Sequence, residues 1–272
     1  MKPVSSHFFN LSIVDPQGYL ERVEREQVER ERLEQQREWL EQQRVAREQV
    51  ERERAQEREE QEFLFRRLKP VDTNYHRDLC CMDGTRQSLL NHVTDWVANK
   101  SAQEDVLHSN TYWFYGSPGI GKTSLAHSIC ANLHEQNRLA GAIFCRRDDP
   151  DLSKPMNILP TFIHKLAMIF PPFRSIVAKR LRDDPNLTPE SMKGALILDF
   201  IRSLPHHPGH TLAFVIDAFD ECGNHRSRSG ILKVLIDTAA RALWLKIVIH
   251  QQNRSRYPTF LQYSHTVVVF TI

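Results

Sequence analysis

One stretch of the chain has the residue types and spacing needed to bind phosphate. Residues 116–123 are Gly-Ser-Pro-Gly-Ile-Gly-Lys-Thr and match the pattern G-x-x-x-x-G-K-[ST]. Glycines let such a loop wrap closely around an anion, so that backbone N–H groups and a helix N-terminus face it. Lys122 can reach the β- and γ-phosphate oxygens, and the Thr123 hydroxyl can join the shell of a Mg²⁺ ion. The predicted cofactor-binding residues are Gly116, Ser117, Pro118, Gly119, Ile120, Gly121, Lys122, Thr123 and Ser124.

A second group of polar residues follows an apolar run further along the chain. Residues 212–216 are Leu-Ala-Phe-Val-Ile, Asp217 comes next, and Asp220 and Glu221 lie one short turn later. Phosphoryl chemistry on a loop of this type needs one acid to hold the metal ion and another group to orient water. Since one carboxylate does both poorly, we predict that Asp217 is a metal ligand with Thr123. Asp220 or Glu221 is then the predicted catalytic residue that orients water.

Together these two motifs resemble a known family. The segments GSPGIGKTS and VIDAFDEC are similar to the NACHT-type branch of the STAND signalling P-loop NTPases, in particular fungal NLR-like proteins of the nephrocystin-like N-terminal domain type. Residues 81–86 with Trp96, residues 113–115 and residues 144–147 resemble further segments of those domains. The resemblance covers residues 70–249. It implies an α/β, parallel-sheet P-loop NTPase of the ASCE type with strand order 5-1-4-3-2, and Mg²⁺ with ATP, favoured over GTP by family habit.

The chain departs from this family in two places. Family members follow the fourth strand with Thr-Ser-Arg-Pro, whose arginine senses the γ-phosphate, whereas residues 249–253 here are Ile-His-Gln-Gln-Asn. The next arginines are Arg254 and Arg256, which are too far along the chain to reach the same point. We therefore expect hydrolysis to be weak or absent. The sequence also ends at Ile272, before the family's C-terminal subdomains, so we expect an incomplete domain.

Composition narrows the classes of partner. The 272 residues carry a formal charge of +2 and are 40% hydrophobic, which excludes a wholly disordered chain. Residues 21–62 hold 15 Glu and 10 Arg, so the remainder is mildly basic. This balance fits a small anionic ligand, here a purine nucleotide, better than a nucleic acid. The five cysteines show no metal-ligand spacing and no stretch is long and apolar enough to span a membrane, so we expect a cytoplasmic protein.

The acidic stretch predicts one long helix. Residues 21–62 contain no Gly or Pro, and Glu–Arg pairs recur at i,i+4. The apolar residues are mostly five apart and spiral around the helix, which makes a poor heptad. A solvated helix and a weakly oligomerising one, as a homo-oligomer or with a helical partner, both remain open. The apolar residues of this predicted helix are Val23, Val28, Leu33, Leu40, Val45 and Val50.

Downstream of this helix the pattern alternates between strands and helices. Short apolar runs predict strands at 111–115, 141–145, 212–216 and 245–249, and amphipathic segments predict helices at 123–134, 157–169, 175–182, 188–204 and 231–241. Such alternation is typical of a parallel sheet covered on both faces. We predict a flexible segment at 1–20, a long helix at 21–69, which could form a coiled coil, and the NTPase domain at 70–272.

Three functions fit these features. The first is a Mg²⁺-dependent purine nucleotide-binding switch in signalling, with compromised turnover. The second is a helical scaffold with a vestigial nucleotide domain. The third is a P-loop small-molecule kinase, although no lid with clustered arginines is recognisable.

Overall fold

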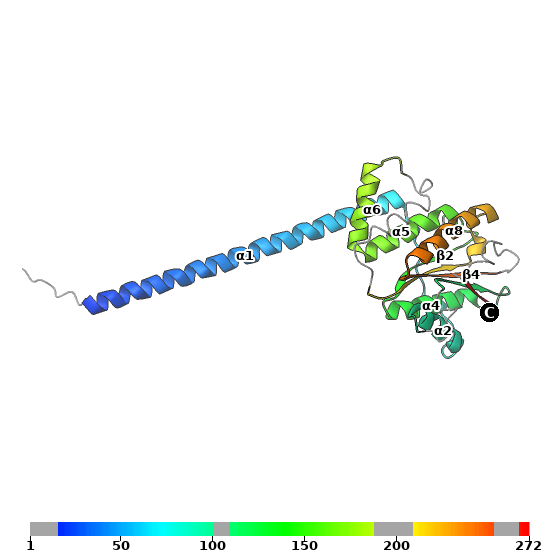
Figure 1. Cartoon of the computed structure of the whole chain (residues 1–272), viewed down its shortest axis with the longest axis horizontal. Helices are drawn as coiled ribbons and strands as arrows, with labels where there is room; N and C mark the ends of the chain where they lie inside the picture. The colour runs from blue at the N-terminus through cyan, green and yellow to red at the C-terminus, as the bar shows by residue number, and fades with distance from the viewer. Residues whose placement is uncertain (1–15, 101–108, 188–208, 253–266, 272) are drawn as a thin grey trace, which may run out of the picture. The chain divides into compact units, whose positions relative to one another are not determined.

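The computed structural model describes residues 16–100, 109–187, 209–252 and 267–271, and Figure 1 shows its elements. By its internal contacts the chain divides into two compact units, one ending at Gln56 and one beginning at Glu57. No helix in the described ranges has both the length and the apolar character needed to cross a membrane.

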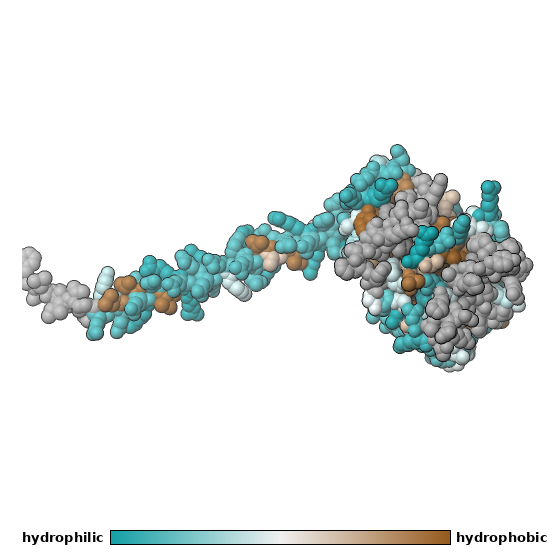
Figure 2. Space-filling model, in the orientation of Figure 1, coloured by the Kyte–Doolittle hydropathy of each residue, from teal (hydrophilic) through white to brown (hydrophobic). Residues whose placement is uncertain are grey.

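Helix α1 (Pro16–Leu68) covers nearly all of the segment 21–69, for which a long helix is predicted, and begins five residues earlier. It begins at a proline, which is favourable in a first helical turn because that N–H has no helical partner. Residues 16–20, expected to be flexible, are therefore helical, and residues 1–15 lie outside the described residues. Figure 2 shows the apolar residues of α1 as separate patches in a hydrophilic surface. Arg44 shows how the exposed surface is stabilised, since it pairs with Glu48 at 3.2 Å one turn later and also with Glu41.

The last turns of α1 belong to the second unit. Leu64 and Leu68 are 0% and 1% exposed and lie in its hydrophobic core. This domain is predicted from the sequence to begin at residue 70, whereas the contacts within the structure begin it at Glu57. The reason is that the Glu- and Arg-rich pattern continues without a break across residue 57, so the composition does not change where burial begins.

The second unit is built on a parallel sheet, as predicted. Its strands are β1 (Thr111–Tyr115), β2 (Leu139–Phe144), β3 (Leu212–Asp217), β4 (Leu245–Gln251) and β5 (Val267–Thr271). They are arranged in the order β2-β3-β4-β1-β5, and every neighbouring pair is parallel. The carboxyl ends of β1 and β3 therefore lie at the same edge of the sheet.

Helices cover both faces of this sheet (Figure 1). Helices α2 (Gln87–Val97) and α4 (Lys122–Glu135) lie on one face, and α5 (Ile158–Ile169) and α8 (His225–Arg241) on the other, with α6 (Pro171–Asp183) beside α5. Residues of β3 alternate between the two cores: Phe214 and Ile216 belong to the α5 and α8 side, whereas Ala213 and Val215 belong to the α2 and α4 side. Burial on both faces explains why the strands are apolar runs.

Some helices begin at other residues than predicted, because capping residues and prolines favour an earlier start. Helix α8 begins six residues before the predicted 231 because Asn224 and Ser227 form a capping box. Helix α6 begins at Pro171, a favourable first-turn residue. Three short 3₁₀ helices, Arg77–Leu79, Pro155–Asn157 and Phe219–Glu221, occupy connections. The helix predicted at 188–204 lies outside the described residues.

Candidate phosphate-binding site

The glycine-rich loop lies where β1 ends and α4 begins. Gly119 and Gly121 have φ of +77° and +83°, a left-handed conformation that costs other residues energy. Helix α4 starts directly after Gly121, and the Leu125 N–H donates to the Gly121 carbonyl oxygen at 3.0 Å. The segment from Ser117 to Gly119 is exposed to solvent. This segment, which leads into the N-terminus of α4, is thus accessible to an anion.

Lys122 points back along this loop. Its side chain is mostly buried, and Nζ donates to the carbonyl oxygens of Gly116 at 3.0 Å and Ser117 at 2.7 Å. Burial lowers the pKa of Lys122, the charges of Asp220 and then Asp217 oppose that effect, and Arg86 adds to it. The two acids that sequence analysis paired with the loop therefore act electrostatically on its lysine.

Asp217 is the last residue of β3 and is 2% exposed. Its backbone oxygen accepts the Cys145 N–H at 3.0 Å, which aligns the end of β2 with the end of β3. The next residue, Ala218, has φ of +50°, an uncommon value for a residue with a Cβ, so the chain turns sharply after the carboxylate. Asp217 thus stands at the carboxyl edge of the sheet, the edge at which β1 leads into the glycine-rich loop.

His250 is the neighbour of Asp217 that sequence analysis did not assign to the site. Its Nδ1 lies 3.3 Å from Oδ1 of Asp217, and its side chain is fully buried. Its ring makes an edge contact with Phe114 on β1, with centroids 4.8 Å apart. In the sequence this histidine belongs to the segment Ile-His-Gln-Gln-Asn, whose more conspicuous feature is the lack of an arginine. Histidine at this position brings a polar ring beside the predicted metal ligand.

Asp220 and Glu221 make different contacts. Asp220 is 6% exposed, and its Oδ1 accepts the backbone N–H of Gln252, just after β4, at 3.1 Å. Glu221 is partly exposed, and its Oε2 accepts the backbone N–H of Arg147 at 3.3 Å. Arg228 holds the turn that contains both acids by donating to the carbonyl oxygens of Asp220 at 3.1 Å and Cys222 at 2.9 Å. Asp220 is therefore hydrogen-bonded to the backbone that follows β4, and Glu221 is hydrogen-bonded to the turn after β2.

A pocket of about 690 Å³ opens beside these acids. It is lined by residues from the turn after β2, from the turn after β3 and from the start of α8. Gly223 joins two of these turns, because its N–H donates to the Ser153 oxygen at 2.9 Å and a Cβ there would lie 2.2 Å from Cγ of Pro155. The residues that line the pocket are Arg147, Ser153, Asp220, Glu221, Gly223, Asn224, His225 and Arg228.

Arg86 provides a further contact to the loop. It precedes α2 with φ of +54°, and its Nη2 donates to the carbonyl oxygen of Ile120. The guanidinium also lies next to Gly121. Arg146, in contrast, forms an exposed pair with Asp148 at 2.8 Å, as in a solvated turn. Of these two arginines, Arg86 is therefore the one that contacts the phosphate-loop backbone.

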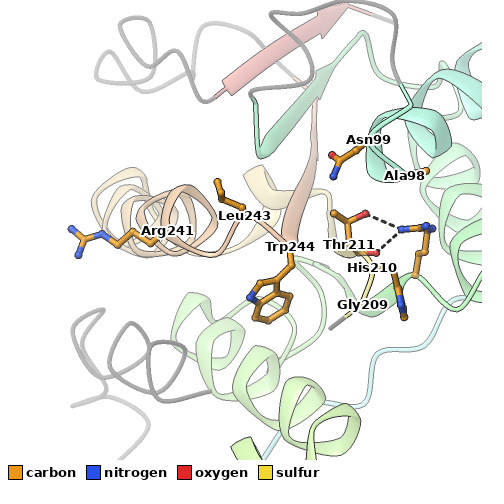
Figure 3. A pocket seen from close by; sticks show the side chains of 9 residues that line it. Ala98, Asn99, Gly209, His210, Thr211, Arg241, Leu243 and Trp244 are labelled. Atoms are coloured by element: carbon orange, nitrogen blue, oxygen red, sulfur yellow. Dashed lines mark hydrogen bonds between the residues drawn. The ribbon is translucent and has the colours of Figure 1, made fainter. Parts of the chain in front are cut away.

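A second pocket, of about 530 Å³, lies at the opposite edge of the sheet. It is lined by residues that precede β2, β3 and β4, including Arg138, Thr211 and Trp244 (Figure 3). Arg138 Nη1 donates to both the hydroxyl of Thr211 at 2.9 Å and its carbonyl oxygen at 3.1 Å. Ligands of open parallel sheets bind at the carboxyl ends of the strands, so this amino-end pocket is separate from the phosphate loop.

The donors at the loop fit a hard divalent cation. Thr123 is an exposed residue in the first turn of α4, and Asp217 offers a carboxylate at the same edge of the sheet. Mg²⁺ prefers oxygen ligands and is usually held by one or two protein groups together with substrate phosphates and water. Thr123 and Asp217 would hold such an ion, which would neutralise charge on the phosphates.

The loop between β1 and α4 of a parallel sheet, with an acid at the end of β3, defines the P-loop NTPase class of fold. More specifically, the model of the family described as nephrocystin 3, N-terminal, matches residues 84–250, more than half of the chain. The chain belongs to this family. Comparison with curated proteins finds no match.

The solved structures that match this chain are distant from it. They include C. elegans PCH-2 (13% identity, TM-score 0.38, covering 72% of this chain and 45% of that one). Drosophila ORC bound to poly(dA/dT) DNA and Cdc6 gives 11% identity, a TM-score of 0.41 and coverages of 68% and 28%. The E. coli MS115-1 HORMA:CdnC:Trip13 complex gives 14% identity, a TM-score of 0.34 and coverages of 69% and 62%. The chain thus spans less than two thirds of each of these chains.

Proposed function

We propose that the unit beginning at Glu57 is a Mg²⁺-dependent purine nucleotide-binding domain that takes ATP in preference to GTP. In this proposal it is the switch domain of a cytoplasmic signalling protein of the STAND, NACHT or NLR-like type. The observation that carries the proposal is the position of Lys122, which lies in the glycine-rich loop and within the electrostatic reach of Asp220 and Asp217. Membership of the nephrocystin 3 N-terminal family and the strand order, read from β5 as β5-β1-β4-β3-β2, are consistent with an ASCE-type domain.

The roles proposed for individual residues follow from their positions. The backbone from Gly116 to Ser124 binds the phosphates, and Lys122 balances their charge. Thr123 and Asp217 hold Mg²⁺. Glu221, which borders the pocket and is the more exposed of the two acids, is better placed than Asp220 to orient a water molecule.

Turnover is proposed to be weak or absent. β4 ends with His250 and Gln251, and Gln252 follows, so no arginine stands there within the described residues; the backbone N–H of Gln252 donates to Asp220. Phosphoryl transfer depends on positive charge that stabilises the transferring group, and an arginine in this role contributes strongly to the rate. A binding domain that cycles slowly fits a switch better than a metabolic enzyme.

Binding of a fluorescent ATP analogue to the full chain tests the proposal. Wild type should bind with Mg²⁺, and Lys122→Ala should weaken binding at least about tenfold because it removes a charged partner of the phosphates. Lys179→Ala, which changes an exposed lysine on α6, is the matched control. Asp217→Asn should reduce the dependence on Mg²⁺, and competition with ATP and GTP identifies the base. Equal binding by wild type and Lys122→Ala would overturn the proposal.

The second candidate is a helical scaffold with a vestigial nucleotide domain. It is favoured by the absence of an arginine at the end of β4 within the described residues. This candidate predicts no nucleotide binding by wild type in the same assay, together with self-association that Lys122→Ala leaves unchanged. The two candidates are therefore separated by the wild-type titration alone.

A further inference from the structure

Two buried cysteines meet where the end of β2 lies beside the turn after β3. Cys145 is the first residue after β2, and Cys222 directly follows the short helix Phe219–Glu221. They are 3% and 0% exposed and belong to the same hydrophobic core. Their thiols are hydrogen-bonded to each other. The fold thus brings into contact two thiols that are far apart in the sequence.

Hydrogen bonds hold Cys222 against the segment that follows β2. On one side of it, Oε2 of Glu221 accepts the backbone N–H of Arg147 at 3.3 Å. On the other side, the Gly223 N–H donates to the carbonyl oxygen of Ser153 at 2.9 Å. Because both neighbours of Cys222 are fixed to this segment, its sulfur atom stays close to that of its partner, as a disulfide requires.

The two thiols lie in different electrostatic environments. The pKa of Cys222 is lowered, first by the hydrogen bond from the Cys145 thiol and also by the charge of Arg228, although burial opposes both. Arg228 lies close by, since its Nη1 donates to the carbonyl oxygen of Cys222 at 2.9 Å. The pKa of Cys145 is raised by the same hydrogen bond and by burial. The thiolate is the reactive form of cysteine, so Cys222 is the better nucleophile of the pair.

The other cysteines lack this arrangement. Burial raises the pKa of Cys130, which makes its thiol unreactive. Cys80 and Cys81 are partly exposed and adjacent in the chain. Among the described residues, which include all five cysteines, Cys145 and Cys222 are therefore the pair whose thiols are bonded to each other.

We propose that Cys145 and Cys222 form a redox-active dithiol, which hydrogen peroxide converts into an intrachain disulfide and a thiol reductant restores. The Cys222 thiolate attacks one peroxide oxygen and the O–O bond breaks. The sulfur becomes a sulfenic acid, and the other oxygen leaves as hydroxide and takes up a proton. The Cys145 sulfur then attacks the sulfenic sulfur, the S–S bond forms, and the sulfenic hydroxyl leaves as water with the Cys145 proton. Two thiols are thus oxidised to one disulfide, and the peroxide is reduced to two molecules of water.

The disulfide would fix the turn after β3 to the end of β2. Neither thiol is open to solvent, so peroxide reaches Cys222 only when this turn opens locally. The pocket of about 690 Å³ borders the turn, and Glu221 and Gly223, the two neighbours of Cys222, line it. Once formed, the bond keeps the turn closed. If Glu221 orients water as proposed above, the oxidised form holds that acid in one place, and this consequence alone rests on the proposed function.

Peptide mapping of the full chain tests the bond. The Cys80→Ala, Cys81→Ala double variant removes the two partly exposed thiols, which would otherwise consume peroxide. After treatment with hydrogen peroxide and alkylation of the remaining thiols in urea, the peptides that contain Cys145 and Cys222 should be linked, and dithiothreitol should separate them. Cys130 should be alkylated in every sample. If both thiols of the pair were still alkylated, or if Cys222 were oxidised without forming a link, the proposal would be overturned.

A trap for sulfenic acid, applied in the same background, tests the order of the steps. In Cys145→Ala the sulfenic acid on Cys222 has no thiol to resolve it, so dimedone should label Cys222 after peroxide treatment. In the matched variant Cys222→Ala, labelling of Cys145 should be at least about tenfold lower, because burial keeps the pKa of its thiol high.

Circular dichroism checks that both of these variants are folded. Equal labelling of Cys145 and Cys222 in the two variants would contradict the assignment of Cys222 as the nucleophile and overturn the proposal. Neither measurement involves a nucleotide, so this proposal and the nucleotide proposal fail separately.

Discussion

Arg174 on α6 and Glu60 on α1 form an ion pair in which both side chains are buried, with exposed fractions of 4% and 7% and a separation of 3.7 Å from Nε to Oε2. Arg174 also pairs with Glu57 at 2.9 Å, and the Ser175 hydroxyl donates to Glu60 at 2.8 Å. The end of a helix that is solvated over most of its length is thus held to the folded unit by charges removed from water.

We expect Arg174→Ala to lower the free energy of unfolding of the second unit by about 3–5 kcal/mol, because the variant leaves the carboxylate of Glu60 buried without its cation. Arg182→Ala is the control on the same helix. Its pair with Glu59 is 3.6 Å long and both side chains are well exposed, so the loss should be below about 1 kcal/mol. Urea unfolding measures the free energy of unfolding of both variants. Equal losses of stability in the two would contradict the role of burial.

Leu64→Ala should also destabilise the second unit, by about 2–5 kcal/mol, since it opens a cavity at a residue that is 0% exposed. Phe65→Ala, at a neighbouring residue that is 59% exposed, should cost less than about 1 kcal/mol. Thermal or urea unfolding compares them. A small effect of Leu64→Ala would mean that the end of α1 contributes little to this core.

Arg86→Ala should weaken nucleotide binding by about tenfold, if the proposed function holds, because the loop loses the charged donor on the Ile120 carbonyl oxygen. Arg77→Ala, which removes an exposed pair with Glu135, serves as the control and should bind like wild type. Titration with the fluorescent nucleotide measures both dissociation constants. Unchanged affinity in Arg86→Ala would show that the loop keeps its shape without this contact.

Lys246 predicts a pH dependence of stability. It is 1% exposed, its Nζ donates to the Ser109 oxygen at 2.9 Å and to Oδ1 of Asn110 at 3.0 Å, and burial lowers its pKa from 10.5 to about 8. At pH values between about 8 and 10.5, Lys246 carries a proton in the unfolded chain but not in the folded chain. Lys246 therefore costs stability below pH 8, and this cost is relieved as the pH rises toward 10.5.

Relative to Lys246→Met, wild type should gain up to about 3 kcal/mol of unfolding free energy over that range. The comparison between the two proteins cancels the titration of groups that they share. Lys233→Met, at an exposed lysine on α8, should show no such pH-dependent difference. Urea unfolding at pH 7, 9 and 10 measures the effect, and a constant difference between wild type and Lys246→Met would contradict it.

The features that the sequence determined by itself are local ones. The glycine-rich loop is recognisable because its whole pattern lies in eight consecutive residues, and the acid at Asp217 is recognisable because it ends an apolar run. The long helix follows from residues 21–62, in which helix-forming residues and i,i+4 pairs act within a few turns.

Only the tertiary structure decided which distant residues join these features. Parallel strands bring His250 beside Asp217, place the N–H of Gln252 on Asp220 and place Arg86 on the phosphate loop. The start of the second unit at Glu57, within an unbroken charged pattern, was likewise set by burial against α6. The physical reason is that such contacts depend on sheet register and helix packing, which arise from many apolar residues acting together, so no single segment carries the signal.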